Sequence, residues 1–182
     1  MSGDRPSIVT FRGRSPRIHD SAFIAPGARI IGDVEIGEDA SIWYNCVLRG
    51  DINRIVIGAR SNLQDGTIVH VEGPRDDPRG LPTLVGDDVL VGHQAILHGC
   101  VLEDRAFVGM GSVVMDGARV SSGGMLAAGA LLAPGKTVTG GQLWAGRPAR
   151  PMRDLAEAEL TAMLEQTRHY VDNARLHKAE MR

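Results

Sequence analysis

The sequence has few aromatic residues, and Phe, Trp and Tyr together make up only 4% of the chain. Large rings therefore cannot fill a core. It has two cysteines, Cys46 and Cys100, which are too few for a disulfide framework and fit a reducing compartment. No apolar run approaches the roughly 18 residues of a membrane span, and residues 1–17 hold no apolar segment typical of a secretory signal. These absences predict a soluble, cytoplasmic protein with no membrane partner.

The sequence also has no large excess of positive or negative charge. Lys and Arg number 20 and Asp and Glu number 22, which gives a net charge of −2 and argues against binding to nucleic acid or anionic membranes. Glycine is abundant instead, with 23 residues in a chain of 182, about twice the usual share. At roughly 150 residues per domain, the length predicts one domain with an appendage.

A six-residue repeat dominates the sequence. Aliphatic residues recur at every sixth position from Ile24 to Leu48, and the pattern resumes after insertions and continues to Val138. A period of six is neither that of a strand nor that of a helix, and is typical of a triangular β-solenoid in which each hexad forms one face and its corner. The aliphatic residues then point inward and stack roughly 4.8 Å apart. A β-sandwich would need period-two alternation with regular turns.

The repeats predict a β-helix domain over residues 1–151, with the hexads at about 22–140. The segment 152–182 is then a C-terminal appendage with a helix over 155–178, because its apolar residues fall at helical spacing. Asp154 and Glu157 resemble a capping box at its start. We expect the apolar stripe of this helix to pack on the solenoid of its own or a neighbouring chain.

Two of the histidines fall in the same register of the repeat. His70 and His98 each directly follow an inward aliphatic residue. When the insertion of ten residues between Val69 and Val85 is removed, their separation is one coil of 18 residues. They should therefore stack on adjacent coils, roughly 5 Å apart, where two imidazoles can share a metal.

A third histidine, His93, lies one hexad before His98 and on another face. Five extended residues span about 16 Å, which makes it hard for these two imidazoles of one chain to share an ion that each must approach to about 2.0–2.1 Å. If one metal takes all three histidines, His93 comes from a neighbouring copy. A ring of three prisms closes such a contact, so the register predicts a trimer with interfacial metal sites.

Three neutral imidazoles with an open fourth position form the catalytic arrangement for zinc, where the pKa of a bound water falls to about 7. The same ligands also suit iron or cobalt. The other histidines, His19, His169 and His177, are interpreted as structural residues. Cys46 and Cys100 are interpreted as buried small residues rather than ligands.

Several segments together resemble the γ-class carbonic anhydrase family, over about residues 15–178. They are Arg-Gly-Asp at 49–51, Asn-Leu-Gln-Asp at 62–65, His70, Gly-His-x4-His-Gly at 92–99 and Ala-Gly-Arg-Pro-Ala at 145–149. The resemblance implies a left-handed parallel β-helix with a C-terminal α-helix, and a homotrimer. It implies a metal, zinc first, held by His70 and His98 of one chain and His93 of the next. It also implies reversible hydration of CO2 to bicarbonate by metal-bound hydroxide.

The resemblance assigns roles to five further residues. Gln64 and Asn62 would orient the hydroxide and the substrate, and Arg49 would pair with Asp51 or Asp65 across the interface and bind bicarbonate. The alternatives remain open. Asn62 and Gln64 suit corner capping or an amide ladder between coils, and Arg49 could be a solvated surface cation.

The sequence departs from the family archetype in its proton shuttle. The archetype has an acidic loop with glutamates, whereas the stretch at 49–57 is short here. The insertion within 71–84 holds Glu72, which is the best substitute shuttle, although a solvated loop is the simpler interpretation. Tyr170 on the C-terminal helix would reach the metal pocket in related proteins, or pack through its ring.

Two other functions fit the same sequence. The missing glutamates favour a metal-bearing trimeric scaffold with weak or no catalysis. The hexad is shared with hexapeptide acyltransferases, and the same pocket could serve a thioesterase. Such acyltransferases use a histidine base without requiring metal, but we find no extended acceptor loop in this sequence.

Overall fold

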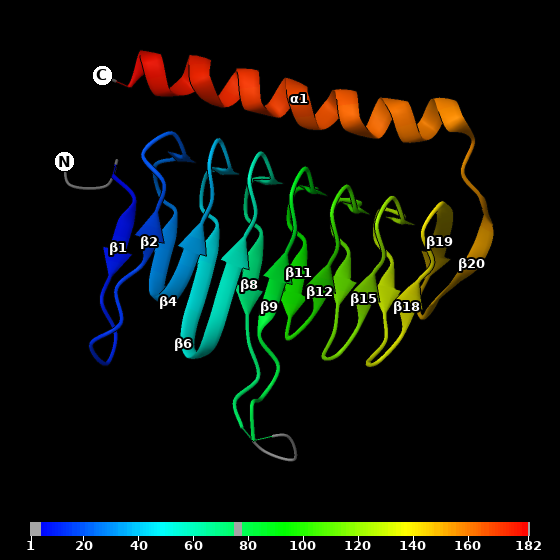
Figure 1. Cartoon of the computed structure of the whole chain (residues 1–182), viewed down its shortest axis with the longest axis horizontal. Coiled ribbons are helices and arrows are strands. Elements are labelled where there is room, and N and C mark those ends of the chain that lie inside the picture. The colour runs from blue at the N-terminus through cyan, green and yellow to red at the C-terminus, as the bar shows by residue number, and fades with distance from the viewer. Residues whose placement is uncertain (1–4, 75–77, 182) are drawn as a thin grey trace.

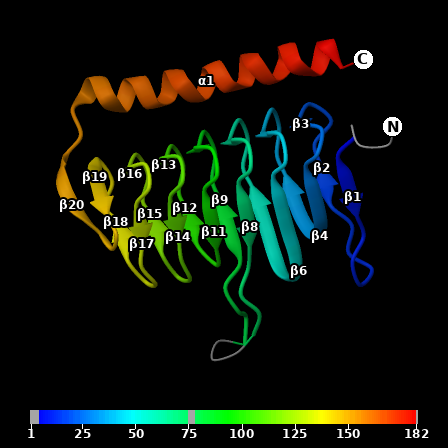
Figure 2. The same ribbon diagram turned by 180° about the vertical axis from the view of Figure 1, so that it is seen from behind.

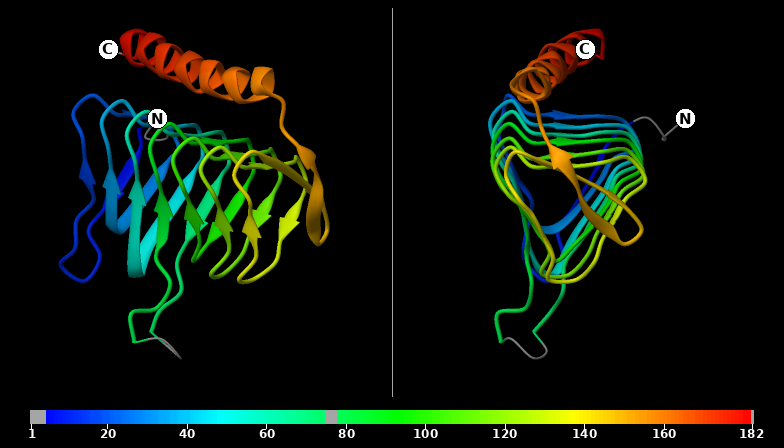
Figure 3. Two further views of the ribbon diagram at one scale, coloured as in Figure 1. Left: turned by 45° about the vertical axis from the view of Figure 1, so that its right-hand side comes forward. Right: turned by 90° about the vertical axis from the view of Figure 1, so that its right-hand side faces the viewer.

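The computed structural model describes residues 5–74 and 78–181. The chain forms a left-handed parallel β-helix of hexapeptide repeats, followed by one α-helix (Figure 1). Viewed along its axis, the β-helix has a triangular outline (Figure 3). The predicted fold class is confirmed, because each hexad supplies a short strand on one face and the turn to the next.

Two of the three faces belong to one continuous sheet. The first face has strands β1 (Ser7–Val9), β8 (Ile68–His70), β11 (Ile96–His98), β14 (Val113–Val114) and β17 (Leu131–Leu132). The second face has strands β2 (Arg17–Ile18), β9 (Thr83–Val85), β12 (Val101–Leu102), β15 (Arg119–Val120) and β18 (Thr137–Val138). Two long strands, β4 (Arg29–Ile36) and β6 (Val47–Ile57), pair with both groups and so continue around the edge between these faces.

The third face is a separate sheet. Its strands are β3 (Phe23–Ile24), β5 (Ser41–Ile42), β7 (Asn62–Leu63), β10 (Leu90–Val91), β13 (Phe107–Val108), β16 (Met125–Leu126) and β19 (Gln142–Gly146). Strand β20 (Ala149–Asp154) then pairs antiparallel with β19, which ends the parallel ladder. Figure 2 shows the same coils from behind, with β13, β16 and β19 in successive turns.

The core is a set of aliphatic ladders that run along the axis. On the first face one ladder consists of Ile30, Leu48, Val69, Leu97, Val114 and Leu132. All six side chains are fully buried. Each stacks on the equivalent residue of the next coil, as the six-residue period predicts, so small aliphatic residues fill a narrow prism that needs no aromatic rings.

The helix α1 (Glu157–Glu180) begins two residues later than predicted. Asp154 is the last residue of β20, so the expected cap at Asp154 and Glu157 is wrong. Ala156 is the N-cap residue, and its N–H donates to the Glu159 carboxylate at 2.9 Å. Arg153 holds that carboxylate with two hydrogen bonds of 2.7 and 2.8 Å. The Glu159 side chain therefore accepts the N–H of the N-cap residue, as the N3 carboxylate of a capping box does.

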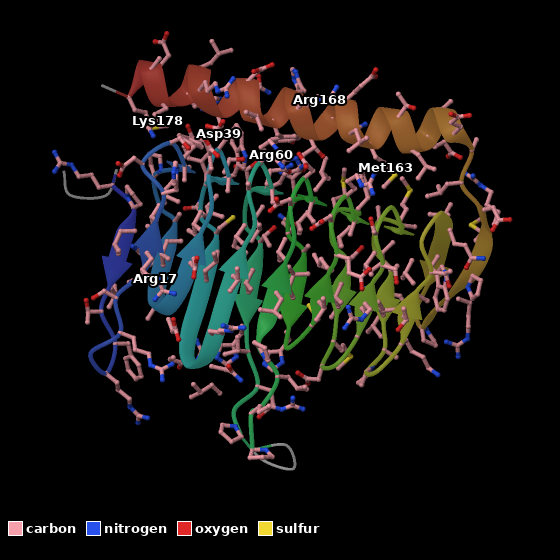
Figure 4. All side chains as sticks on the ribbon, in the orientation of Figure 1. Arg17, Asp39, Arg60, Met163, Arg168 and Lys178 are labelled. Atoms are coloured by element: carbon pink, nitrogen blue, oxygen red, sulfur yellow. The ribbon has the colours of Figure 1, made fainter. Side chains whose placement is uncertain are left out.

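The helix runs back along the solenoid and contacts β3, β5, β7 and β10 of the third face. Its buried residues are Met163, Thr167, Val171 and Ala174. Polar contacts hold its C-terminal half: Arg175 bonds Asp39 at 2.9 Å, and the Lys178 ammonium donates to the carbonyl of Ala22 at 3.0 Å. Figure 4 shows Lys178 on the helix beside the coil of Asp39. Within residues 5–74 and 78–181, no helical segment combines the length and the hydrophobicity of a membrane span.

Candidate metal centre

Two histidines lie side by side where the first face meets the second, an edge that we call the histidine-pair edge. Strands β8 and β11 are neighbours, and their register pairs His70 with His98. The two ring centroids are 5.1 Å apart, and Nδ1 of His70 lies 3.1 Å from Nε2 of His98. The predicted stacking on adjacent coils is confirmed.

A carboxylate and a guanidinium flank His70. Leu48 pairs with Val69, which places Arg49 at the level of His70. Asp51 accepts a hydrogen bond from Nε2 of His70 at 2.9 Å and one from Arg49 at 2.5 Å, within the same chain. Burial alone would raise the pKa of Asp51, but the hydrogen bonds from His70 and Arg49 outweigh it and lower that pKa. Asp51 is therefore an anion at neutral pH.

Sequence reasoning missed the carboxylate beside His98. Oδ1 of Asp116 lies 2.6 Å from Nδ1 of His98, and both side chains are about one-third exposed. The signal was present, because Asp116 follows His98 by 18 residues, which is the length of one coil. A search for carboxylates one coil away from each predicted ligand would have found it.

Glu72 also belongs to the histidine-pair edge. Ligand atoms of Glu72, His98 and Asp116 all lie within 4.8 Å of one another, and the three residues are half-buried. The backbone of Glu72 is held by two hydrogen bonds of 2.9 Å with Leu81, and the Asn53 amide donates to its carbonyl at 3.1 Å. The insertion at 71–84 therefore brings the predicted shuttle, Glu72, beside His98, while its residues 75–77 lie outside the described part of the chain.

His93 lies on a different edge, where the third face meets the first, which we call the single-histidine edge. It comes two residues after β10, whereas His98 ends β11, so the first face separates them. Nδ1 of His93 lies 2.8 Å from Oδ2 of Asp65. Oδ1 of Asp65 in turn accepts the backbone N–H of Tyr44 at 3.1 Å. The predicted separation of His93 from the pair within one chain is confirmed.

The two predicted amides approach the single-histidine edge from the third face. Asn62 and Gln64 flank the inward Leu63, so both side chains point outward, toward the face on which α1 packs. Both are buried. Gln64 donates to Asn62 at 3.2 Å, and Asn62 donates a long bond of 3.5 Å to the carbonyl of Val89.

Tyr170 lies near the same edge. Its ring packs edge-on against Trp43 with centroids 5.4 Å apart. Burial raises the pKa of Tyr170, and the negative charge of Asp65 raises it further. The phenol is therefore protonated at neutral pH and close enough to Asp65 to sense its charge.

The predicted site residues thus fall into two groups in a single chain. The histidine-pair edge holds Arg49, Asp51, His70, Glu72 and His98, joined by Asp116. The single-histidine edge holds Asn62, Gln64, Asp65, His93 and Tyr170. Within one chain these groups do not meet.

Residues interpreted as structural have structural contacts. Nδ1 of His177 lies 2.9 Å from the Tyr44 hydroxyl, and its ring packs on Trp43 at 5.0 Å between centroids. Cys46 and Cys100 are buried free thiols, and burial raises the pKa of each to about 12. Both cysteines are therefore neutral and serve as small core residues.

Comparisons with known proteins relate the chain to one family. Residues 15–50 match the family described as bacterial transferase hexapeptide (six repeats). The chain is 45% identical over 172 residues to a carbonic anhydrase of Geobacillus kaustophilus, covering 94% of this chain and 91% of that protein. It is 45% identical over 174 residues to the mitochondrial gamma carbonic anhydrase 2 of Arabidopsis thaliana, covering 96% of this chain but only 63% of that protein's length.

A solved structure shows the same fold. The crystal structure of a hexapeptide transferase family protein from Anaplasma phagocytophilum superposes with a TM-score of 0.87 at 47% identity. The superposition covers 93% of this chain and 96% of that one. The chain therefore belongs to the γ-class carbonic anhydrase-like family of hexapeptide-repeat, left-handed β-helix proteins.

Proposed function

We propose that this protein is a metal-dependent carbonic anhydrase of the γ type, which converts CO2 and water reversibly to bicarbonate and a proton. The family relationship supports a metal cofactor and a small-molecule substrate. The observation that carries the proposal is the environment of the three histidines, because each one has an aspartate on one ring nitrogen.

Metal-bound histidines nearly always donate their second ring N–H to a carboxylate, carbonyl or water, which sets the tautomer and the ring orientation. The pairs and their N–O distances are His70 with Asp51 at 2.9 Å, His98 with Asp116 at 2.6 Å, and His93 with Asp65 at 2.8 Å. In each pair the other ring nitrogen remains for a metal. The presence of three such histidine–aspartate pairs supports the interpretation of His70, His98 and His93 as metal ligands rather than as unrelated structural histidines.

The histidine pair also has the spacing of metal ligands. Two nitrogens on a tetrahedral zinc, each about 2.0–2.1 Å from the ion, are about 3.3 Å apart. Nδ1 of His70 and Nε2 of His98 are 3.1 Å apart. The pair therefore fits a divalent cation; zinc is our first choice, and iron or cobalt would suit the same imidazoles.

The third ligand requires a second copy of the chain. The first face, which separates the two edges, carries an outward aliphatic ladder of Val47, Ile68, Ile96, Val113 and Leu131. Ile68 and Ile96 are 46% and 42% exposed. An apolar stripe of this kind between the two halves of a site marks a protein interface. We propose a homotrimer in which the histidine-pair edge of one copy meets the single-histidine edge of the next.

The chain's own residues then have distinct tasks. A bound divalent metal would supply a coordinated water with a pKa near 7 and would polarise a substrate oxygen. Gln64 and Asn62 orient the attacking water and CO2 through their amides. Arg49, held by Asp51, attracts the bicarbonate anion. The carboxylate of Glu72 takes up the released proton and passes it to solvent.

Tyr170 has a positioning task in this proposal. Its ring packs on Trp43, and its neutral phenol lies close to Asp65. It would therefore shape the substrate pocket at the single-histidine edge while remaining protonated.

The test is the metal content of a His93→Ala variant purified without chelator. We expect the variant to keep its circular dichroism spectrum and to lose stoichiometric zinc, measured by plasma mass spectrometry. The matched control is His169→Ala, because His169 is an exposed histidine on α1 whose ring contacts Asn173, one helical turn away, at 3.1 Å. Stoichiometric zinc in the His93→Ala protein would rule out the proposed ligand set.

A transferase is the second candidate, because the solved structure at 47% identity carries a hexapeptide transferase name. Acyl transfer or thioester hydrolysis through a histidine base would survive exhaustive chelation. Activity on acyl thioesters after metal removal, with no CO2 hydration by the metal-loaded protein, would favour that function.

A further inference from the structure

We propose that Asp116 is a positioning residue, which fixes the tautomer of His98 and so keeps its Nε2 available to the metal. This inference rests on the proposed function, because it assigns His98 to a metal. Asp116 would act through His98 and would contact neither the metal nor the substrate.

The contact between the two side chains is short. Oδ1 of Asp116 lies 2.6 Å from Nδ1 of His98, which is shorter than the usual N–H···O range and typical of a charge-assisted bond. A carboxylate accepts hydrogen bonds, so it favours the tautomer with the proton on Nδ1. The Nε2 lone pair of His98 is then free, and this atom faces His70 at 3.1 Å.

The backbone beside His98 leaves room for this carboxylate. Gly99 follows His98 and has a positive φ of 51°. A Cβ atom at Gly99 would lie only 2.6 Å from Oδ1 of Asp116 and 3.0 Å from Cβ of Leu81. Any other residue at this corner would therefore displace the Asp116 carboxylate or strain the turn.

The corner itself is held by main-chain groups rather than by the carboxylate. The N–H of Gly117 donates to the carbonyl of Gly99 at 2.7 Å, and the N–H of Gly135 donates to the carbonyl of Asp116 at 2.9 Å. An Asp116→Asn substitution preserves these bonds and the side-chain shape. It introduces an amide NH2 that can donate to Nδ1 of His98, which shifts the ring proton to Nε2.

The experiment compares wild type, Asp116→Asn and a matched control, Glu103→Gln. Glu103 is a suitable control because its carboxylate is exposed to a similar degree, 38% against 35%, and also has a short partner, Arg119 at 2.5 Å. Zinc affinity is measured by competition with a chromophoric chelator. The His98 tautomer is read from its ring nitrogen shifts in metal-free protein labelled with 15N-histidine.

We expect Asp116→Asn to bind zinc about 10- to 100-fold more weakly and to lose the Nδ1–H signature of His98, while Glu103→Gln matches wild type in both. Wild-type zinc affinity together with an unchanged Nδ1–H in Asp116→Asn would overturn the inference.

The two proposals fail in different ways. If wild type itself binds neither zinc nor iron nor cobalt, the proposed function fails, and the nitrogen shifts still decide whether Asp116 sets the tautomer. If Asp116→Asn does not fold, Gly99→Ala displaces the carboxylate without removing it, and we expect it to weaken zinc binding too. A folded Gly99→Ala protein with a displaced carboxylate and full zinc affinity would refute the positioning role.

Discussion

Two variants that each lack a metal site should restore sites when they are mixed. His93→Ala removes the ligand of the single-histidine edge and leaves the histidine-pair edge intact. His98→Ala does the reverse. Because the two edges lie on opposite sides of the first face, a site between copies can combine one intact edge from each variant.

The proposed trimer sets the expected magnitude. In a closed ring of three copies, each contact joins the histidine-pair edge of one subunit to the single-histidine edge of the next. In a random one-to-one mixture, each of the two subunits at a contact is of the required type half of the time. The whole mixture, which includes trimers of one variant, should therefore recover about one quarter of the wild-type zinc sites, whereas a site within one chain would recover none.

The assay uses the two variants with different affinity tags, refolded together and purified through both tags in succession. Double purification keeps only mixed trimers and discards those made of one variant, and each mixed trimer has one productive contact among three, so these should hold about one zinc per trimer. Each variant refolded alone is the control and should hold none. Mixed trimers without zinc, or zinc in either variant alone, would refute the division of ligands between edges.

Three further predictions concern stability and the thiols. The hydrogen bonds from Arg153 lower the pKa of Glu159 from its ordinary 4.5 to about 2, so this pair stabilises the fold above about pH 4.5 and loses its effect as the pH falls toward 2. The difference in urea midpoint between wild type and Glu159→Gln should therefore shrink as the pH is lowered over that range. A difference that stays constant would contradict this prediction. Leu97 is fully buried, so Leu97→Ala should lower the free energy of unfolding by about 3–5 kcal/mol in urea titrations. A loss below about 1 kcal/mol would contradict this prediction. Cys46 and Cys100, with pKa values raised to about 12 by burial, should react with Ellman's reagent only after unfolding, and rapid reaction of the native protein would count against their burial.

The parts of the fold that follow from the repeat were predictable from the sequence. The six-residue period determines which side chains point inward, so counting residues placed His70 beside His98 and put His93 on another edge, and the observed register agrees. The stacking of Arg49 at the level of His70 followed from the same count. These relations depend on one periodic element, for which local spacing and spatial neighbourhood are equivalent.

Contacts between different elements were not predictable in this way. The helix begins after Ala156, where the Glu159 carboxylate, held by Arg153, accepts the N–H of Ala156. The spacing of acidic residues in the sequence fits this start and a start at Asp154 equally well. The outward amides of Asn62 and Gln64 are buried on the face where α1 packs. The path of the helix over the third face determines this burial, and the hexads alone do not.

The most direct test of the account is CO2 hydration by stopped flow on protein purified without chelator, with metal content determined on the same sample. Zinc, iron and cobalt are then removed and reloaded in turn. The account predicts that turnover rises in proportion to occupied sites and disappears on chelation. Full occupancy without turnover over a wide pH range would contradict it and would identify a metal-bearing scaffold.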